Sequence, residues 1–295
     1  METFDLGIAW DQEQDNEFVE GLNNYAVKEG LKPYLLHAYN FYGSLKDITE
    51  NKISFRFLLN RTSDNDPVFR GLPDFLKRKG ITFINHPDKA KESRDKFKMH
   101  LKFNSHDIPV PKTALLNPEE DRKSLELKIK YVSKPFVIKP ADGYGEETIL
   151  DAQSLDDVIK LKEQHGDIKY IAREKILHKS LENKPAWFRV FYCCGKVIPC
   201  WWHPKTHVYD ILTMKQVYAL GLYDMWHMTR RISQVCKLDF FSAELVMKND
   251  EKFLVVDLDD QPYLRRKSKF NDGVPDEIVD KVIQNIVSFV REKVK

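Results

Sequence analysis

Residues 134–148 read KPFVIKPADGYGEET, an apolar strand that ends in a lysine and a proline and runs into a loop with two glycines. An ordinary strand and turn explains the segment if Gly143 and Gly145 supply positive φ angles and Lys139 is solvated. A phosphate site is the alternative, with Lys139 as a point charge and the backbone N–H groups of residues 142–146 closing over a nucleotide. A single glycine-rich loop is a weak signal, so the rest of the sequence has to decide.

Residues 253–262, FLVVDLDDQP, carry carboxylates at the end of another apolar strand. Alternation along a strand places Asp257 and Asp259 on one face and Leu258 on the other. Glu244 lies in the preceding strand, and a turn between the two strands would pair them, so that three carboxylates converge. Such a cluster needs a cation, and magnesium is typically held by a few carboxylates together with substrate phosphates. A polar turn with Glu244 facing solvent is the alternative, but a lysine and glycine loop in the same chain favours the magnesium site.

The composition indicates a folded protein. Of its 295 residues, 42% are hydrophobic and 31% are charged, and no apolar run approaches the roughly 18 residues needed to cross a bilayer. The first ten residues lack the pattern of a secretory signal, so we expect a cytoplasmic location and no membrane partner. Four cysteines in a chain of this length favour reduced thiols. The net charge of +2 is too small to predict a nucleic-acid partner, although LRRKSK at residues 264–269 is a local exception.

The order of predicted elements divides the chain into three lobes. Residues 1–86 alternate strands and helices, which predicts a small α/β lobe with a parallel sheet. Residues 87–172 begin with one long predicted helix near Pro87, and include a second helix, SLDDVIKLKEQHG, with Ser154 as its N-cap. Residues 173–295 are rich in strands, which predicts an α+β lobe built mainly on antiparallel sheet.

Two patterns in the last lobe predict local structure. Cys194 and Gly195 separate two apolar arms, as is typical of a hairpin turn. Residues 275–295 place apolar side chains at helical spacing on one face, and this predicts a helix that packs that face against the core.

Taken in chain order, these features resemble the ATP-grasp family over residues 85–270. The segment RDKFKMHLKFNSHDIPVP is similar to the family's lysine-led helix and short strand, and the resemblance implies that Lys96 is the first phosphate-binding lysine. Lys139 in FVIKP would be the second. ADGYGEET, with Gly143 and Gly145, resembles the glycine-rich lid over the phosphates.

The resemblance also covers the adenine hinge, the metal site and an arginine. REKIL resembles the hinge, with Glu174 beside the adenine amino group and the backbone of Lys175 and Ile176 on the ring edge. Arg189 in WFRVF resembles the arginine that reaches the terminal phosphate, so Arg189 and Lys139 are the predicted catalytic residues. The acids that match the family's metal ligands are Glu244, Asp257 and Asp259.

This resemblance implies a fold class and a reaction. The fold would be α/β and α+β, with the small N-terminal lobe followed by two α+β lobes that clamp ATP. ATP and Mg²⁺ would be the cofactors. Most of the family transfers the γ-phosphate to a carboxylate and lets an amine attack the acyl phosphate. We therefore expect a carboxylate-amine ligase that releases ADP and phosphate, with small-molecule or peptide substrates, and many relatives pair as homodimers.

The chain departs from the family pattern at three positions. Asp259 stands where the third metal ligand is often Asn. Trp187 stands where many relatives carry an acid two residues before the arginine, which leaves Glu182 as the candidate contact to the ribose. Peptide-forming relatives carry an arginine two residues before the first metal acid, and none precedes Glu244 in this way. The last departure weakens the ligase interpretation.

Two other functions are compatible with the same nucleotide site. One is a kinase that phosphorylates a hydroxyl of an acidic small molecule, which Arg265, Arg266 and Lys267 in YLRRKSKF would grip. A solvated, charged loop is the alternative for that segment. The other function is a nucleotide-binding regulatory module without turnover.

Overall fold

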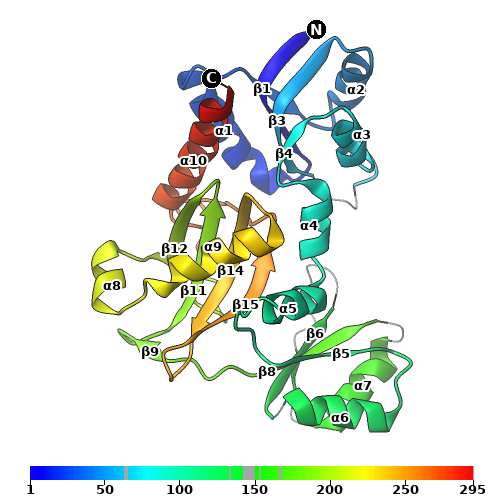
Figure 1. Ribbon diagram of the computed structural model, residues 1–295, viewed down its shortest axis with the longest axis vertical. Helices are drawn as coiled ribbons and strands as arrows, with labels where there is room; N and C mark the ends of the chain where they lie inside the picture. Colours follow the sequence, from blue (N-terminus) through cyan, green and yellow to red (C-terminus); the bar gives the residue numbers. More distant parts are fainter. Residues whose placement is uncertain (63–65, 133, 142–149, 153, 166–167, 295) are drawn as a thin grey trace.

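The described residues of the computed structural model form three sheets of four or five strands and one two-stranded ribbon. The structure describes residues 1–295 except 63–65, 133, 142–149, 153, 166–167 and 295. In Figure 1 the N-terminal sheet lies at one end of the long axis, the sheet of residues 113–174 at the other, and the five-stranded sheet between them.

The N-terminal lobe is a parallel sheet, as predicted. Its strand order is β2-β1-β3-β4, and each neighbouring pair is parallel. Helices flank the sheet, and one of them, α2, was not predicted because its buried stripe includes Ser44 and its sequence contains Gly43. The elements are β1 (Glu2–Trp10), η1 (Glu13–Asp15), α1 (Asn16–Lys28), β2 (Pro33–Leu36), α2 (Phe41–Thr49), β3 (Ile53–Arg61), α3 (Leu72–Arg78) and β4 (Thr82–Ile84).

The single helix predicted from Pro87 is wrong, since the chain forms two helices, α4 (Pro87–Ser93) and α5 (Lys96–Asn104). Asp95 causes the break: its backbone is extended, and its side chain accepts a hydrogen bond of 2.9 Å from the backbone N–H of Lys98. Aspartate is a strong N-cap and a weak helix former, so it starts a new helix here. Lys96 therefore occupies the first position of α5.

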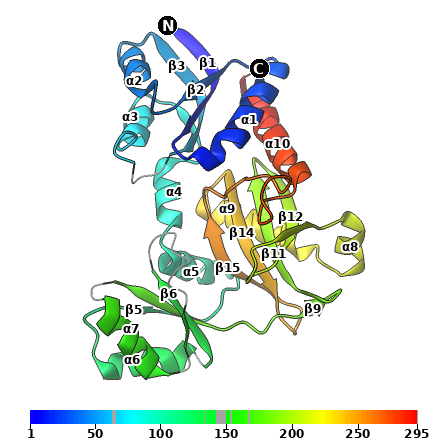
Figure 2. The same cartoon turned by 180° about the vertical axis from the view of Figure 1, so that it is seen from behind.

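The central lobe is a four-stranded antiparallel sheet in the order β5-β8-β6-β7. Helices α6 and α7 cover the face that is turned away from α5 (Figures 1 and 2). Ser154 caps α7 as predicted, because Ser154 Oγ accepts from the N–H of Asp157 at 3.3 Å and Asp157 Oδ2 accepts from the N–H of Ser154 at 3.0 Å. The elements are β5 (Thr113–Leu116), α6 (Arg122–Val132), β6 (Phe136–Pro140), β7 (Leu150–Ala152), α7 (Leu155–His165) and β8 (Tyr170–Glu174).

The third sheet is antiparallel throughout, in the order β13-β12-β11-β14-β15. The predicted hairpin joins β11 to β12, and Cys194 and Gly195 have φ angles of 48° and 91°. The ribbon consists of β9 (Ser180–Leu181) and β10 (Lys184–Pro185). The other elements are β11 (Trp187–Cys193), β12 (Lys196–Trp202), β13 (Tyr209–Ile211), α8 (Met214–Ala219), α9 (Asp224–Cys236), β14 (Phe240–Met247), β15 (Phe253–Asp259) and α10 (Asp276–Val294).

The largest hydrophobic core is shared between the first lobe and the last. It contains Leu6 and Phe57 of the parallel sheet together with Phe191 and Phe240 of the third sheet. Helix α10 packs against both and runs beside α1, which both views show (Figures 1 and 2). Of the predicted inner face, Ile278, Val282 and Ile286 are buried, and Phe289 is partly buried.

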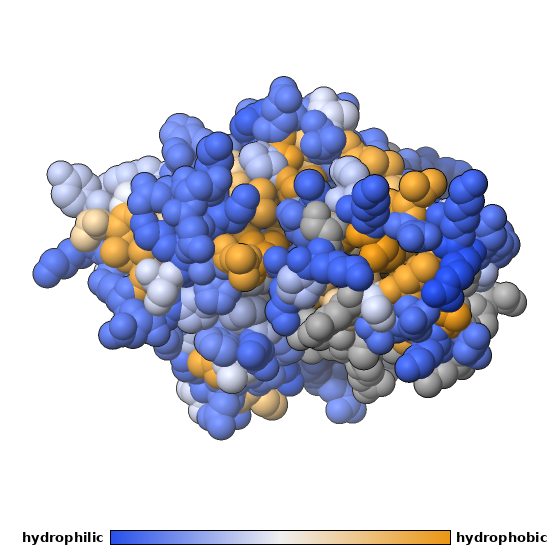
Figure 3. All heavy atoms as spheres, turned by 90° about the horizontal axis from the view of Figure 1, so that it is seen from below, coloured by the Kyte–Doolittle hydropathy of each residue, from blue (hydrophilic) through white to orange (hydrophobic). Residues whose placement is uncertain are grey.

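The surface of the described residues is mostly polar. Figure 3 shows a largely hydrophilic face on which hydrophobic residues form separate patches. Among the helices that the structure describes, none is long and apolar enough to cross a membrane. The four cysteines are free thiols, as predicted.

Candidate active site

The paired strands β14 and β15 bring the predicted carboxylates together. Glu244 lies opposite Asp257, and the register shifts at the next pair, where Leu245 lies opposite Val255. Val256 is therefore an extra residue on β15, a β-bulge that reverses the alternation of side chains. Leu258 packs into the core on the far side of the sheet. Asp257 is thus on the face of Glu244, as predicted, although no sequence pattern indicated the bulge.

Two cations of the chain bind these acids. Arg189 lies opposite Glu244 across β11 and β14, and donates from Nη1 to Glu244 Oε1 at 2.6 Å and from Nη2 to Asp259 Oδ2 at 3.2 Å. Lys139 Nζ donates to Asp257 Oδ2 at 2.9 Å. Each of the three carboxylates is therefore neutralised by a side chain from a neighbouring strand or lobe.

The acids suit magnesium in chemistry, since Mg²⁺ prefers carboxylate oxygens. Their present placement is different: over the described part of the chain, no group of three or more His, Cys, Asp or Glu side chains is arranged to hold a metal ion. Lys139 and Arg189 instead form ion pairs with Glu244, Asp257 and Asp259. These three carboxylates would supply the oxygen ligands of the ion if both side chains turned away from them.

Lys139 is a buried cation at the end of β6, and only 5% of it is exposed. Burial lowers its pKa to about 8, and the charges of Arg173 and Lys96 add to this effect while Asp257 opposes it. Burial alone would raise the pKa of Asp257, but Lys139 and Lys96 hold it well below its usual range. Both lysines predicted from the sequence therefore act on one carboxylate, although they come from a helix and a strand far apart in the chain.

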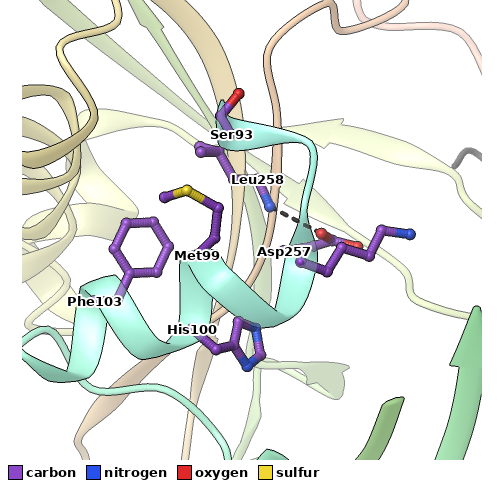
Figure 4. Close-up of a pocket in the computed structure, with 7 residues that line it drawn as sticks. Ser93, Met99, His100, Phe103, Asp257 and Leu258 are labelled. Atoms are coloured by element: carbon purple, nitrogen blue, oxygen red, sulfur yellow. Dashed lines mark hydrogen bonds between the residues drawn. The ribbon is translucent and has the colours of Figure 1, made fainter. Parts of the chain in front are cut away.

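A small pocket lies where α5 meets β15, and Figure 4 shows it from close by. Met99, His100 and Phe103 reach it from α5, and the backbone N–H of Leu258 donates to Asp257 Oδ1 at 3.0 Å. The lining residues are Ser93, Lys96, Met99, His100, Phe103, Asp257 and Leu258. Lys96 thus borders the carboxylate cluster from the first turn of α5.

Comparisons with known proteins support the fold. No family model and no curated protein matches the chain. Among solved structures, the ATP-grasp ligase PsnB in complex with a minimal precursor, Mg and ADP has a TM-score of 0.66 at 11% identity, over 97% of this chain and 98% of PsnB. D-alanine–D-alanine ligase from Bacillus anthracis, in complex with ATP, has a TM-score of 0.66 at 12% identity, over 99% of this chain and 96% of that one.

The macrocyclase MdnB from Microcystis aeruginosa MRC has a TM-score of 0.64 at 10% identity, over 97% of this chain and 98% of MdnB. The chain has the ATP-grasp fold. At these identities the likeness shows the architecture, which is the one that the residue pattern predicted.

The hinge predicted for this ATP-grasp chain is partly occupied by its own backbone. Glu174 Oε1 accepts from the N–H of Lys112 at 3.1 Å. The N–H of Lys175 donates to the carbonyl of Pro135 at 3.1 Å, so this N–H already has a partner in the chain. Ile176 packs against the shared core. The predicted lid residues Gly143 and Gly145 lie outside the described residues.

The candidate ribose contact, Glu182, lies in the turn between β9 and β10, where its φ angle is 49°. Its Oε2 accepts from Gln216 Nε2 of α8 at 2.7 Å. This contact ties Glu182 to α8, and the structure does not bring it to the carboxylate cluster.

The basic segment, residues 264–269, is bound to acids of its own chain. Its ion pairs include Arg265 to Asp272 at 2.8 Å, Arg266 to Asp280 at 2.6 Å and Lys267 to Asp210 at 3.1 Å. The cations that were predicted to grip an acidic substrate therefore hold the segment against the third lobe.

The sequence analysis missed several polar residues that support the site. Asn85 Oδ1 accepts from the N–H groups of Asp239 at 2.8 Å and Phe240 at 2.7 Å, and so fastens the first lobe to the start of β14. Arg94 and the buried Asp260 form an ion pair of 3.1 Å next to Asp259. In the sequence, the signal for this pair was Asp260, a second acid directly after Asp259. Its partner Arg94 lies 166 residues away in the chain.

Proposed function

We propose that this chain is an ATP- and Mg²⁺-dependent ligase that joins a carboxylate to an amine through an acyl phosphate and releases ADP and phosphate. The observation that supports it most is the contact between Lys139 of the central lobe and Asp257 of the third lobe, beside Arg189 with Glu244 and Asp259. Cations for phosphates and acids for a metal thus meet at the junction of two lobes.

The residues have separable tasks in this proposal. Lys96, Lys139 and Arg189 turn from the carboxylates to the phosphates of ATP, and this exchange frees Glu244, Asp257 and Asp259 to hold magnesium. Bound magnesium supplies charge neutralisation on the transferred phosphoryl group. Catalysis then consists mainly of positioning and of electrostatic stabilisation by preorganised charges.

The bond changes balance without a further reactant. A carboxylate oxygen of the first substrate attacks the γ-phosphorus, and the bond to the ADP oxygen breaks. The amine nitrogen of the second substrate then attacks the acyl carbon, phosphate leaves, and the nitrogen loses a proton. The solved ATP-grasp structures include complexes with a precursor peptide, so peptide side chains are candidate substrates beside small molecules. ATP use and free thiols agree with a cytoplasmic enzyme.

The kinase alternative relied on the basic segment. Arg265, Arg266 and Lys267 of that segment are paired with Asp272, Asp280 and Asp210, so the structure adds nothing in favour of the kinase.

The test follows the γ-phosphate of labelled ATP in the presence of Mg²⁺ and pools of carboxylates and amines. We expect labelled inorganic phosphate only when both pools are present, and a hydroxamate when hydroxylamine replaces the amines. The Lys139→Ala variant should lose this activity. Label retained on a metabolite would instead identify a kinase, and nucleotide binding without turnover would identify a regulatory module.

A further inference from the structure

The carbonyl of Val256, the bulged residue of β15, accepts hydrogen bonds from one half-buried and one buried side chain. Arg173 Nη1 donates to it at 3.0 Å, and His100 Nε2 lies 3.3 Å from it. The next residue is Asp257, so these contacts act one peptide away from a carboxylate of the site. The sequence analysis singled out neither donor.

Arg173 lies on the face of the central sheet that bears Lys139. It sits in β8 between Thr113 of β5 and Val137 of β6, and Lys139 follows Val137 by two residues on the same strand. Alternation therefore places Arg173 and Lys139 on one face. Two side chains of this face thus reach β15: Lys139 binds the carboxylate of Asp257, and Arg173 binds the carbonyl that precedes it.

The charge of Arg173 suits this position. Burial lowers its pKa from the ordinary value, while Asp257 and Glu244 favour the charged form. A guanidinium remains protonated at neutral pH, so its hydrogen bond to a buried carbonyl is charge-assisted and stronger than a neutral one.

We propose that Arg173 is a positioning residue for Asp257: its hydrogen bond to Val256 fixes the bulge that turns Asp257 toward Glu244. The inference rests on the proposed function, in which Asp257 holds the metal. A strand that loses its bulge shifts by one residue, and such a shift carries every following side chain to the opposite face. Arg173 also joins the sheet of Lys139 to the strand of Asp257, and so sets the spacing between the phosphate lysine and the metal carboxylate.

His100 is a second, weaker support at the same carbonyl. Burial, followed by the charges of Arg173 and Lys139, lowers its pKa to about 4, so the ring is neutral at pH 7 and has one N–H. Nδ1 lies 2.8 Å from the hydroxyl of Thr113, which also donates to the carbonyl of Pro111 at 2.9 Å, and His100 donates to Val256 only when its hydrogen is on Nε2. Arg173 is therefore the donor to test first.

The first measurement is amide hydrogen exchange in the ligand-free protein. Three variants are compared with the wild type: Arg173→Met removes the donor at similar size, Arg173→Lys keeps one charged donor, and Arg122→Met is a control on the same lobe. Arg122 pairs with Asp156, and its side chain is 65% exposed. We expect at least about tenfold faster exchange at Asp257 and Leu258 in Arg173→Met, and restoration to within about threefold in Arg173→Lys. Unchanged exchange in Arg173→Met would overturn the proposal.

The second measurement uses Mn²⁺ as a metal visible by electron paramagnetic resonance, with the nonhydrolysable nucleotide AMPPNP. Arg173→Met should weaken Mn²⁺ binding about 10- to 100-fold, as expected for a residue that orients a metal ligand, and leave the metal-free affinity for AMPPNP unchanged. Arg173→Lys should recover most of the loss. An equal loss of metal-free affinity would make Arg173 a nucleotide contact and overturn the proposal. If the wild type binds neither Mn²⁺ nor AMPPNP, the proposed function fails, while hydrogen exchange still decides whether Arg173 holds the strand.

Discussion

Two sets of ion pairs in this chain have similar distances and different surroundings. At the candidate active site the N···O distances run from 2.6 to 3.2 Å, and in the pairs of Arg265 with Asp272, Arg266 with Asp280 and Lys267 with Asp210 from 2.6 to 3.1 Å. The acid side chains of the site are 14% to 25% exposed, whereas those of these three pairs in the basic segment are 46% to 52% exposed. Short ion pairs alone therefore do not distinguish a ligand site from a structural contact.

Besides burial, the two sets differ in whether their acids converge on one place. The acids of the site share one face of β14 and β15, and Arg189 contacts two of them at once. The acids of the basic segment come from separate places, with Asp210 in β13, Asp272 in a loop and Asp280 in α10. A converging set can exchange its cations for a metal, whereas a dispersed set fastens the segment to the protein.

The sharpest test of this comparison removes one acid from each set. Asp257→Asn should lower Mg²⁺-dependent phosphate release about 100- to 1,000-fold, because a metal ion contributes several kcal/mol of charge stabilisation and its ligand is lost. Asp272→Asn, at the exposed pair, should change it by less than about twofold. Steady-state phosphate release over a range of substrate concentrations measures the activity of both variants. A tenfold change in the apparent KM of Asp272→Asn would instead place the substrate at the basic segment.

A second test removes one arginine from each set and measures stability. Arg189→Met leaves Glu244 and Asp259 without their cation in a place of low exposure, and should lower the free energy of unfolding by about 2–3 kcal/mol. Arg266→Met should cost at most about 1 kcal/mol, since its partner is exposed. Denaturant unfolding with and without Mg²⁺ checks the difference. Magnesium should restore part of the lost stability in Arg189→Met but not in Arg266→Met. Equal losses of stability in both variants would show that the two sets of ion pairs do not differ in this way.

The smallest effect concerns Lys139, whose pKa falls from the ordinary value of 10.5 to about 8. Between these two values the unfolded chain binds one proton more than the folded chain, so this residue makes the free energy of unfolding rise with pH. Below about pH 8 the lysine is charged in both states, and its contribution is constant. The difference in unfolding free energy between the wild type and Lys139→Met should therefore grow from pH 8 to pH 10. A difference in unfolding free energy that does not change with pH would show that burial does not shift the pKa of Lys139.

The sequence predicted the parts of the structure that depend on local patterns. The parallel first sheet followed from alternating strands and helices, and the pairing of the strands that carry Glu244 and Asp257 followed from a short turn between two apolar segments. Lys139 was placed at a strand end by the apolar residues before it. These predictions needed only the period of the side chains and the chemistry of turns.

Other parts depend on contacts that no local pattern contains. Helix α9 was not predicted, because its buried face mixes Met225 and Ile232 with Thr229 and Cys236. The bulge at Val256 depends on Arg173, which lies 83 residues away. The ion pairs of the three predicted metal ligands could not be derived from the sequence either. Each pair joins strands from different lobes, or strands of one sheet that lie far apart in the chain.

The core that the first and last lobes share has a consequence for how the chain folds during synthesis. Helix α10 fills the space between β1 and β11, and the central lobe is inserted between the two halves of this core. The ribosome therefore makes the parallel sheet, the central lobe and the five-stranded sheet before the helix that closes the shared core. Until α10 emerges, the apolar faces of β1 and β11 stay open to water, so a nascent chain at this stage should be a substrate for chaperones.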